Sequence, residues 1–178
     1  MAKPLIPVPF PHMCLNSHNV PPPDYQMMNT WKVAASESPG KIVGWIAQVA
    51  AGAPGGKLAT VIFNSHGIPS GILMGSGIRR PDTGLFSALR GLVDRIWIVA
   101  CRVALIQNAT GPGSTAPGDG NLFCCELAKA SGAYVTASTT WQRVDRNDIP
   151  PGYIDGWEGA ALTYGPEGNV VGATYSPL

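Results

Sequence analysis

The sequence carries little charge and contains no long hydrophobic run. Lys and Arg together number 12 and Asp and Glu number 11, so the formal net charge of the 178 residues is +1. A balance this close to zero gives no argument for binding to nucleic acid or to an anionic membrane surface. No apolar run approaches the roughly 20 residues that a membrane-spanning helix requires. We therefore expect neither a nucleic-acid partner nor a membrane partner.

The chain also begins without the pattern of a secretory signal peptide. A signal peptide has a basic region followed by an apolar one, and here prolines break up the apolar residues near the start: Pro4, Pro7, Pro9 and Pro11. This pattern favours a cytoplasmic protein, or one that is exported without a classical signal peptide.

The few cysteines show neither a disulfide framework nor the spacing of a metal site. There is no C-x-x-C pair among Cys14, Cys101, Cys124 and Cys125. We interpret all four as reduced thiols. His12 and His18 flank Cys14, but isolated side chains in an irregular segment explain them better, because a metal site needs fixed geometry. We expect no metal and no other cofactor.

Glycine and proline, in contrast, are plentiful, with 22 and 17 residues spread along the chain. They indicate a loop-rich protein, and the length suits a single domain with one core. Prolines are dense in residues 1–24, which close with Pro21-Pro22-Pro23. We predict an extended or polyproline II arm over residues 1–24, which could dock a protein partner, and one domain over residues 25–178.

Strands and helices are predicted to alternate along that domain. Short apolar runs predict strands over residues 30–35, 58–63, 95–100 and 133–137. Helical spacing of apolar residues predicts helices over residues 40–51, 83–91 and 119–131. Residues 160–164 and 170–175 flank a turn and predict a C-terminal antiparallel hairpin. The alternation indicates an α/β fold with helices that cross between parallel strands.

Two of the predicted strands run into reactive side chains. Residues 58–63 lead to His66-Gly67, and residues 95–100 lead to Cys101. Right-handed crossovers would bring both ends to the carboxyl edge of the sheet, where open α/β folds bind ligands. His66 is the only histidine beyond the N-terminal arm, so the pair suggests a thiolate nucleophile and its base. Gly67 would let a backbone N–H approach a substrate carbonyl, with the Cys101 N–H as second donor.

These residues also have ordinary structural explanations. A cysteine at the end of a buried strand is usually a small core residue, and a lone histidine usually lies at the surface. Cys124 and Cys125 fall in an apolar helical pattern, and we interpret them as core packing. Residue types and spacing alone leave open whether His66 and Cys101 form a catalytic pair.

Taken together, the two blocks resemble the signatures of caspase-like cysteine peptidases. In that clan one apolar strand ends in His-Gly and a later one ends in Ala-Cys or Asp-Cys, as Ser65-His-Gly67 and Ala100-Cys-Arg102 do here. The similarity covers residues 57–140 and is strongest to bacterial CHAT-like domains, with Leu73-Met-Gly75 and residues 127–138 as further matching blocks. The resemblance implies a three-layer caspase-like sandwich around a mainly parallel central sheet.

The resemblance also implies a cysteine endopeptidase that hydrolyses peptide bonds without a cofactor. Cys101 would be the nucleophile, and His66 would transfer the proton, often to the leaving amine rather than from the thiol. The backbone amides of Gly67 and Cys101 would hold the oxyanion. An extended protein or peptide substrate would contact the neighbouring residues Ser65, Arg102, Ser138 and Thr139.

Two other functions stay open at this point. The same fold could be a catalytically silent scaffold or binding module, with the loop over residues 105–117 covering the site. The pair could also belong to a thiol amidase that acts on another amide, such as peptidoglycan. Charges that could select the residue before the scissile bond occur in both signs: Asp82, Asp119, Asp155 and Glu158, or Arg79, Arg80, Arg102 and Arg143.

Overall fold

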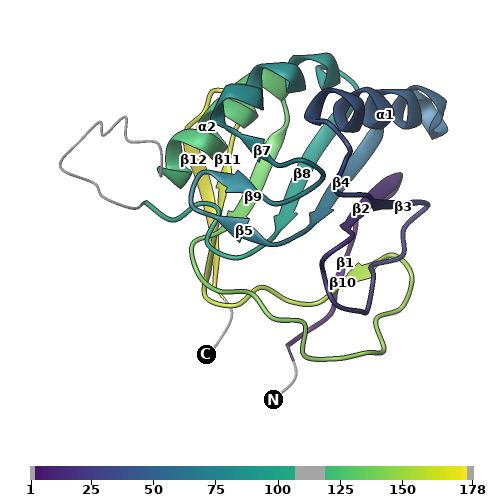
Figure 1. Ribbon diagram of the computed structural model, residues 1–178, viewed down its shortest axis with the longest axis vertical. Helices are drawn as coiled ribbons and strands as arrows, with labels where there is room; N and C mark the ends of the chain where they lie inside the picture. The colour runs from purple at the N-terminus through teal and green to yellow at the C-terminus, as the bar shows by residue number, and fades with distance from the viewer. Residues whose placement is uncertain (1–2, 107–118, 176–178) are drawn as a thin grey trace.

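The computed structural model describes residues 3–106 and 119–175, and its centre is a mixed seven-stranded sheet in the order β12-β11-β9-β8-β4-β2-β3 (Figure 1). Its parallel part consists of β2 (His12–Ser17), β3 (Asn29–Val33), β4 (Leu58–Asn64), β8 (Val93–Val99) and β9 (Tyr134–Ser138). At one edge β11 (Ala160–Tyr164) and β12 (Val170–Tyr175) run antiparallel. The predicted α/β fold with a mainly parallel sheet is confirmed.

Helices cover one face of this sheet. α1 (Pro39–Gly52), the 3₁₀ segment η2 (Arg80–Leu89) and α2 (Gly120–Ser131) lie along the same side of the strands (Figure 1). Alternate residues of the parallel strands join the helices in the main core: Met13, Leu15, Val61, Phe63, Ile96, Ile98, Val135 and Ala137. Each large apolar side chain buried in this way contributes about 1.5–3 kcal/mol.

The ends of both α-helices follow from local capping. The Ser38 hydroxyl accepts the Lys41 backbone N–H, and Pro39 occupies the first turn of α1, which the short 3₁₀ turn η1 (Pro54–Gly56) follows. Asp119 accepts two backbone N–H groups at the start of α2, and Gly132 ends that helix with φ +68°. The helices predicted over residues 40–51 and 119–131 are confirmed. The third, over residues 83–91, is a 3₁₀ segment that begins earlier, at Arg80.

The opposite face of the sheet is built differently from the expected third layer. Among the described residues it carries no helix, and extended segments cover it instead. β1 (Ile6–Pro7) pairs antiparallel with β10 (Tyr153–Ile154) over this face. A second core cluster forms there between these segments and the sheet: Val8, Cys14, Tyr25, Ile62, Ile154 and Trp157. Prolines in both covering segments disfavour a helix, because proline removes a backbone donor and clashes with the preceding turn.

The N-terminal segment belongs to the core. β2 lies between β3 and β4 in the sheet, and the Met13, Cys14 and Leu15 side chains are fully buried. The prediction of an extended or polyproline II arm outside the domain over residues 1–24 is therefore wrong for residues 12–17, which form a strand inside the sheet. Six residues between prolines give a weak strand pattern, and pairing with β4, more than 40 positions away in the chain, decides their structure.

A small three-stranded sheet follows β4 and positions the His66 turn. It consists of β5 (Gly67–Ile68), β6 (Gly71–Ile72) and β7 (Ile78–Arg79), all antiparallel. Across residues 3–106 and 119–175, none of the helices combines the length and the apolar character needed to cross a membrane.

Candidate active site

His66 and Cys101 line one pocket at the carboxyl ends of β4 and β8. These strands are parallel neighbours, with Asn64 opposite Val99 in the register. Each reactive side chain lies two residues beyond the end of its strand, so the crossover through η2 brings both to the same edge. The pocket has a volume of about 310 Å³ and takes further walls from residues 20–25 and 142–156. The structure thus brings together the two side chains that the sequence singled out.

Gly67 is the point of contact between the turn after β4, which carries His66, and the turn after β8, which carries Cys101. A Cβ atom on Gly67 would lie 2.4 Å from the Cys101 carbonyl oxygen and 2.6 Å from a methyl carbon of Val103. Only glycine fits such an approach, so the turn after β4 packs directly on the backbone of the turn after β8. Among the described residues, no backbone carbonyl accepts the Cys101 N–H.

The His66 ring is exposed and is oriented by one hydrogen bond. Its Nε2 atom lies 3.1 Å from the carbonyl oxygen of Asn19, in the loop after β2. A carbonyl oxygen can only accept, so Nε2 carries the proton and donates it. In the neutral ring the lone pair is then on Nδ1. Nothing in the sequence pattern distinguished Asn19, because its partner is 47 positions away.

The Cys101 sulfur is half-buried against the backbone of Gln142. The Gln142 N–H donates to Sγ at 3.3 Å, and Sγ lies 3.5 Å from the Gln142 carbonyl oxygen, to which the thiol donates. Both polar groups of the Gln142 backbone thus contact the sulfur. Arg102 then turns the chain with φ +58°, a left-handed conformation that costs about 1–2 kcal/mol for a residue with a side chain. The Arg102 N–H donates to the Thr140 carbonyl at 2.9 Å, and this hydrogen bond offsets part of that conformational cost.

The Gln142 side chain holds this backbone in place. Its amide nitrogen donates to the Ser138 hydroxyl at 2.7 Å and to the Glu158 carbonyl at 2.8 Å. Its amide oxygen accepts the Glu158 N–H at 3.0 Å. Gln142 thus ties the end of β9 and the segment before β11 to the sulfur. The sequence analysis missed this residue, since a single polar side chain in a loop carries no local signal.

The residues expected to contact substrate fall into two groups. Ser65 is buried and lines the pocket, and its hydroxyl donates to the His66 carbonyl at 3.0 Å. Arg102, Ser138 and Thr139 do not line it. The Arg102 guanidinium lies 5.0 Å from the ring centre of Trp141, while Ser138 and Thr139 hydroxyls bond the backbone at Thr140 and Ala160. These three residues support the Gln142 segment from behind.

Charged groups of both signs line the pocket. The buried carboxylate among them, that of Asp155, already has its partners within the protein. Arg143, Asp145 and Asp155 line it. The Asp155 carboxylate is 1% exposed, accepts the backbone N–H groups of Asp145 and Gly156, and lies 3.5 Å from the Lys3 ammonium. The Arg146 guanidinium is 3.6 Å from the same carboxylate. Asp155 therefore organises the pocket wall.

Lys3 links the N-terminal segment to this wall. Its ammonium donates to the Arg143 carbonyl and lies 3.3 Å from the Glu158 carboxylate and 3.7 Å from that of Asp145. The Arg146 guanidinium in turn donates to the Lys3 carbonyl. A loop-built wall is thus fixed by a residue near the start of the chain, about 140 positions before it. The sequence placed Lys3 only in the predicted extended or polyproline II arm.

The other charges considered from the sequence lie elsewhere. Asp119 caps α2, Asp82 accepts the Arg79 backbone N–H at 2.8 Å, and Arg80 pairs with Glu126 at 2.6 Å. The loop over residues 105–117, which could cover the site, lies outside the described residues beyond Ile106. Among the described residues, no three His, Cys, Asp or Glu side chains gather as a possible metal site.

The remaining thiols differ from Cys101 in their surroundings. Burial raises the pKa of the Cys14 thiol and of the Cys124 thiol, so both stay protonated at neutral pH. Cys124 lies in the main core, as the helical pattern predicted, and Cys125 is half-buried against it. Cys101 alone lines the pocket with a histidine. The chain matches no protein-family model, no curated protein and no solved structure.

Proposed function

We propose that this protein is a cysteine peptidase of the caspase-like type, with Cys101 as nucleophile and His66 as proton-transfer group. One observation carries the proposal: the two side chains follow neighbouring parallel strands and line one pocket, with Gly67 packed on the Cys101 backbone. The mainly parallel sheet and the order of histidine before cysteine support the same fold type. The substrate would be a protein or peptide that lies extended over this edge.

The geometry supports a two-step acyl transfer. The Cys101 thiolate attacks the carbonyl carbon of the scissile amide, and the new oxyanion accepts the backbone N–H of Cys101 and that of Gly67. His66, protonated at Nδ1 and held by Asn19 at Nε2, gives its Nδ1 proton to the leaving amine as the C–N bond breaks. Water then attacks the thioester, His66 takes its proton, and the carboxylic acid leaves as the thiolate is restored.

A rate measurement at Cys101 tests the proposal without a known substrate. We expect iodoacetamide to alkylate Cys101 well below the pKa of about 8.5 of a free thiol, and we expect His66→Ala to slow it. Peptide mass spectrometry over a pH series reads each cysteine separately. Cys125 is the internal control, because it is half-buried and lies away from the histidine. Labelling of Cys101 no faster than Cys125, or only after unfolding, would contradict the proposal.

One observation favours a catalytically silent binding module instead. The Cys101 sulfur is hydrogen-bonded to both the N–H and the carbonyl of Gln142, so its polar contacts are made within the protein. A silent module would keep the pocket but show ordinary thiol reactivity. A peptide aldehyde or other cysteine-directed probe that protects Cys101 from alkylation, and loses this effect in His66→Ala, would favour the peptidase.

A further inference from the structure

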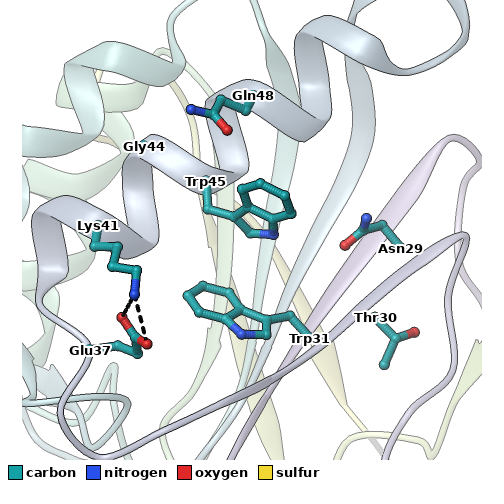
Figure 2. A pocket seen from close by; sticks show the side chains of 8 residues that line it. All are labelled: Asn29, Thr30, Trp31, Glu37, Lys41, Gly44, Trp45 and Gln48. Atoms are coloured by element: carbon teal, nitrogen blue, oxygen red, sulfur yellow. Dashed lines mark hydrogen bonds and ion pairs between the residues drawn. The ribbon is translucent and has the colours of Figure 1, made fainter.

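A groove with two tryptophans lies at the β3 edge of the sheet. Trp31 of β3 and Trp45 of α1 pack edge to face with ring centres 6.5 Å apart. Figure 2 shows the two indoles next to each other, with the Glu37–Lys41 ion pair to one side and Asn29 and Thr30 to the other. The groove has a volume of about 580 Å³. Trp45 is 43% exposed, although the apolar side chains on the inner face of α1 are buried.

The strand beside this groove has an open backbone edge. β3 is the last strand of the sheet, and among the described residues it pairs only with β2. An edge strand of this kind presents a row of unpaired N–H and C=O groups that can pair with another chain. Charged side chains usually protect such edges, and here Lys32 is the only charge on β3, held by Asp24 at 2.7 Å.

We propose that this edge is the interface of a homodimer, in which β3 pairs antiparallel with β3 of a second copy. A two-fold axis perpendicular to the sheet joins the two seven-stranded sheets and leaves both α1 helices on the same side. The two copies then cover Trp31 and Trp45 of each other. This inference does not depend on the proposed peptidase function, because the groove shares no residue with the Cys101 pocket.

The charge of the groove suits a second copy as the occupant. An interface between identical patches around a two-fold axis must be complementary to itself. The groove carries one carboxylate, Glu37, and one ammonium, Lys41, beside uncharged amide, hydroxyl and indole groups. A patch of one sign would repel its own copy, whereas here Glu37 and Lys41 pair at 2.7 Å within one chain, so two copies can meet without repulsion between like charges.

Gly44 leaves the backbone of α1 without a side chain at the groove. It lies inside α1, where glycine weakens a helix, and it lines the groove. A Cβ atom there would meet nothing within 4 Å, so no contact within the chain requires glycine. The bare backbone at this position leaves room for the helix of a second copy.

The mass of the full chain in solution tests the proposal. Light scattering over a wide concentration range is expected to give twice the 18.6 kDa of one chain at high concentration and to fall towards one chain on dilution. Gly44→Lys places a long cation in the interface but has open space in the single chain. It is expected to fold normally by circular dichroism and to weaken the dimer at least tenfold.

Matched variants elsewhere on the helical layer separate this edge from other surfaces. Gly84 also has open space around it, and Leu85 is 44% exposed, close to the 43% of Trp45. Gly84→Lys and Leu85→Lys should leave the dimer intact, whereas Trp45→Lys should dissociate it. A single-chain mass at every concentration overturns the proposal. So does a dimer that survives both Gly44→Lys and Trp45→Lys, since its interface would then lie on another surface.

Discussion

The two faces of the sheet are built by different means. The helical face holds the main core, where α1, η2 and α2 pack on alternate strand residues such as Phe63 and Ile96. The opposite face is covered by extended segments from the two ends of the chain, which meet in the β1–β10 pair. Hydrogen bonds and ion pairs around Asp155 and Gln142 fix those segments.

This difference separates the part of the molecule that stabilises the sheet from the part that surrounds the candidate site. The helical face is apolar and periodic, and burial of its side chains provides a rigid sheet. The loop-covered face carries the pocket walls, so its polar contacts decide the shape of the site around Cys101. The following changes separate the two contributions, in order of decreasing effect.

The largest effect is expected for a cavity on the helical face. Phe63 is fully buried and packs near Phe86, with ring centres 6.1 Å apart. Phe63→Ala should lower the free energy of unfolding by about 3–5 kcal/mol, because the lost contacts leave a cavity. Urea denaturation measures this change. The exposed control Leu85→Ala should change the same quantity little, and a small loss in Phe63→Ala would show that the helical face is not the stable one.

A smaller effect is expected where Lys3 of the N-terminal segment holds the loop-covered face. Lys3→Met leaves Asp155 buried without its ammonium partner, and we expect a loss of about 2–3 kcal/mol. Hydrogen exchange should rise in residues 143–158 but stay slow in β4 and β8. Lys57→Met is the matched control, because its pair with Asp94 is exposed and such pairs contribute roughly 0–1 kcal/mol. Uniformly faster exchange across the sheet would contradict this division.

The pH dependence of stability compares one buried thiol on each face. Cys14 lies in the cluster under the loops and Cys124 in the main core, and burial raises the pKa of both. The unfolded chain loses these protons above its pKa of about 8.5 while the folded chain keeps them. Stability should therefore be fully present below that pH and fall above it, by up to about 1.4 kcal/mol per pH unit and thiol.

Denaturation between neutral and alkaline pH measures this slope. Cys14→Ala and Cys124→Ala should each reduce it, and iodoacetamide should reach Cys14 before Cys124 if the loop-covered face opens first. Equal protection of the two thiols would show that both faces open together.

The smallest change in stability is expected at Gln142, with a specific effect on the cysteine. Gln142→Ala removes three side-chain hydrogen bonds to Ser138 and Glu158, each worth up to roughly 1 kcal/mol in net stability and less where water replaces the half-buried side chain. The Gln142 backbone should then hold Sγ less firmly, and iodoacetamide should reach the half-buried sulfur faster. The rate of Cys101 labelling at one pH measures this. Gln48→Ala, on the exposed side of α1, should leave that rate unchanged.

The accuracy of the sequence predictions follows the same division. α1 and α2 were predictable because their caps and apolar spacing are local, and β4 and β8 because their apolar runs are continuous. β2 was missed, since prolines flank six residues whose strand state depends on pairing with β4. The expected helices on the second face were wrong for the described residues, because segments rich in proline and glycine cover that face.

By itself the sequence determined the α/β class, the helical face and the proposed pair of His66 and Cys101, because these depend on periodicity, caps and strand ends within short windows. Tertiary structure alone decided that Asn19 orients the His66 ring, that Gln142 contacts the sulfur, and that Lys3 anchors the pocket wall. Those contacts join positions about 40 to 155 apart. Their geometry arises only when the sheet brings both ends of the chain together, so no local pattern encodes it.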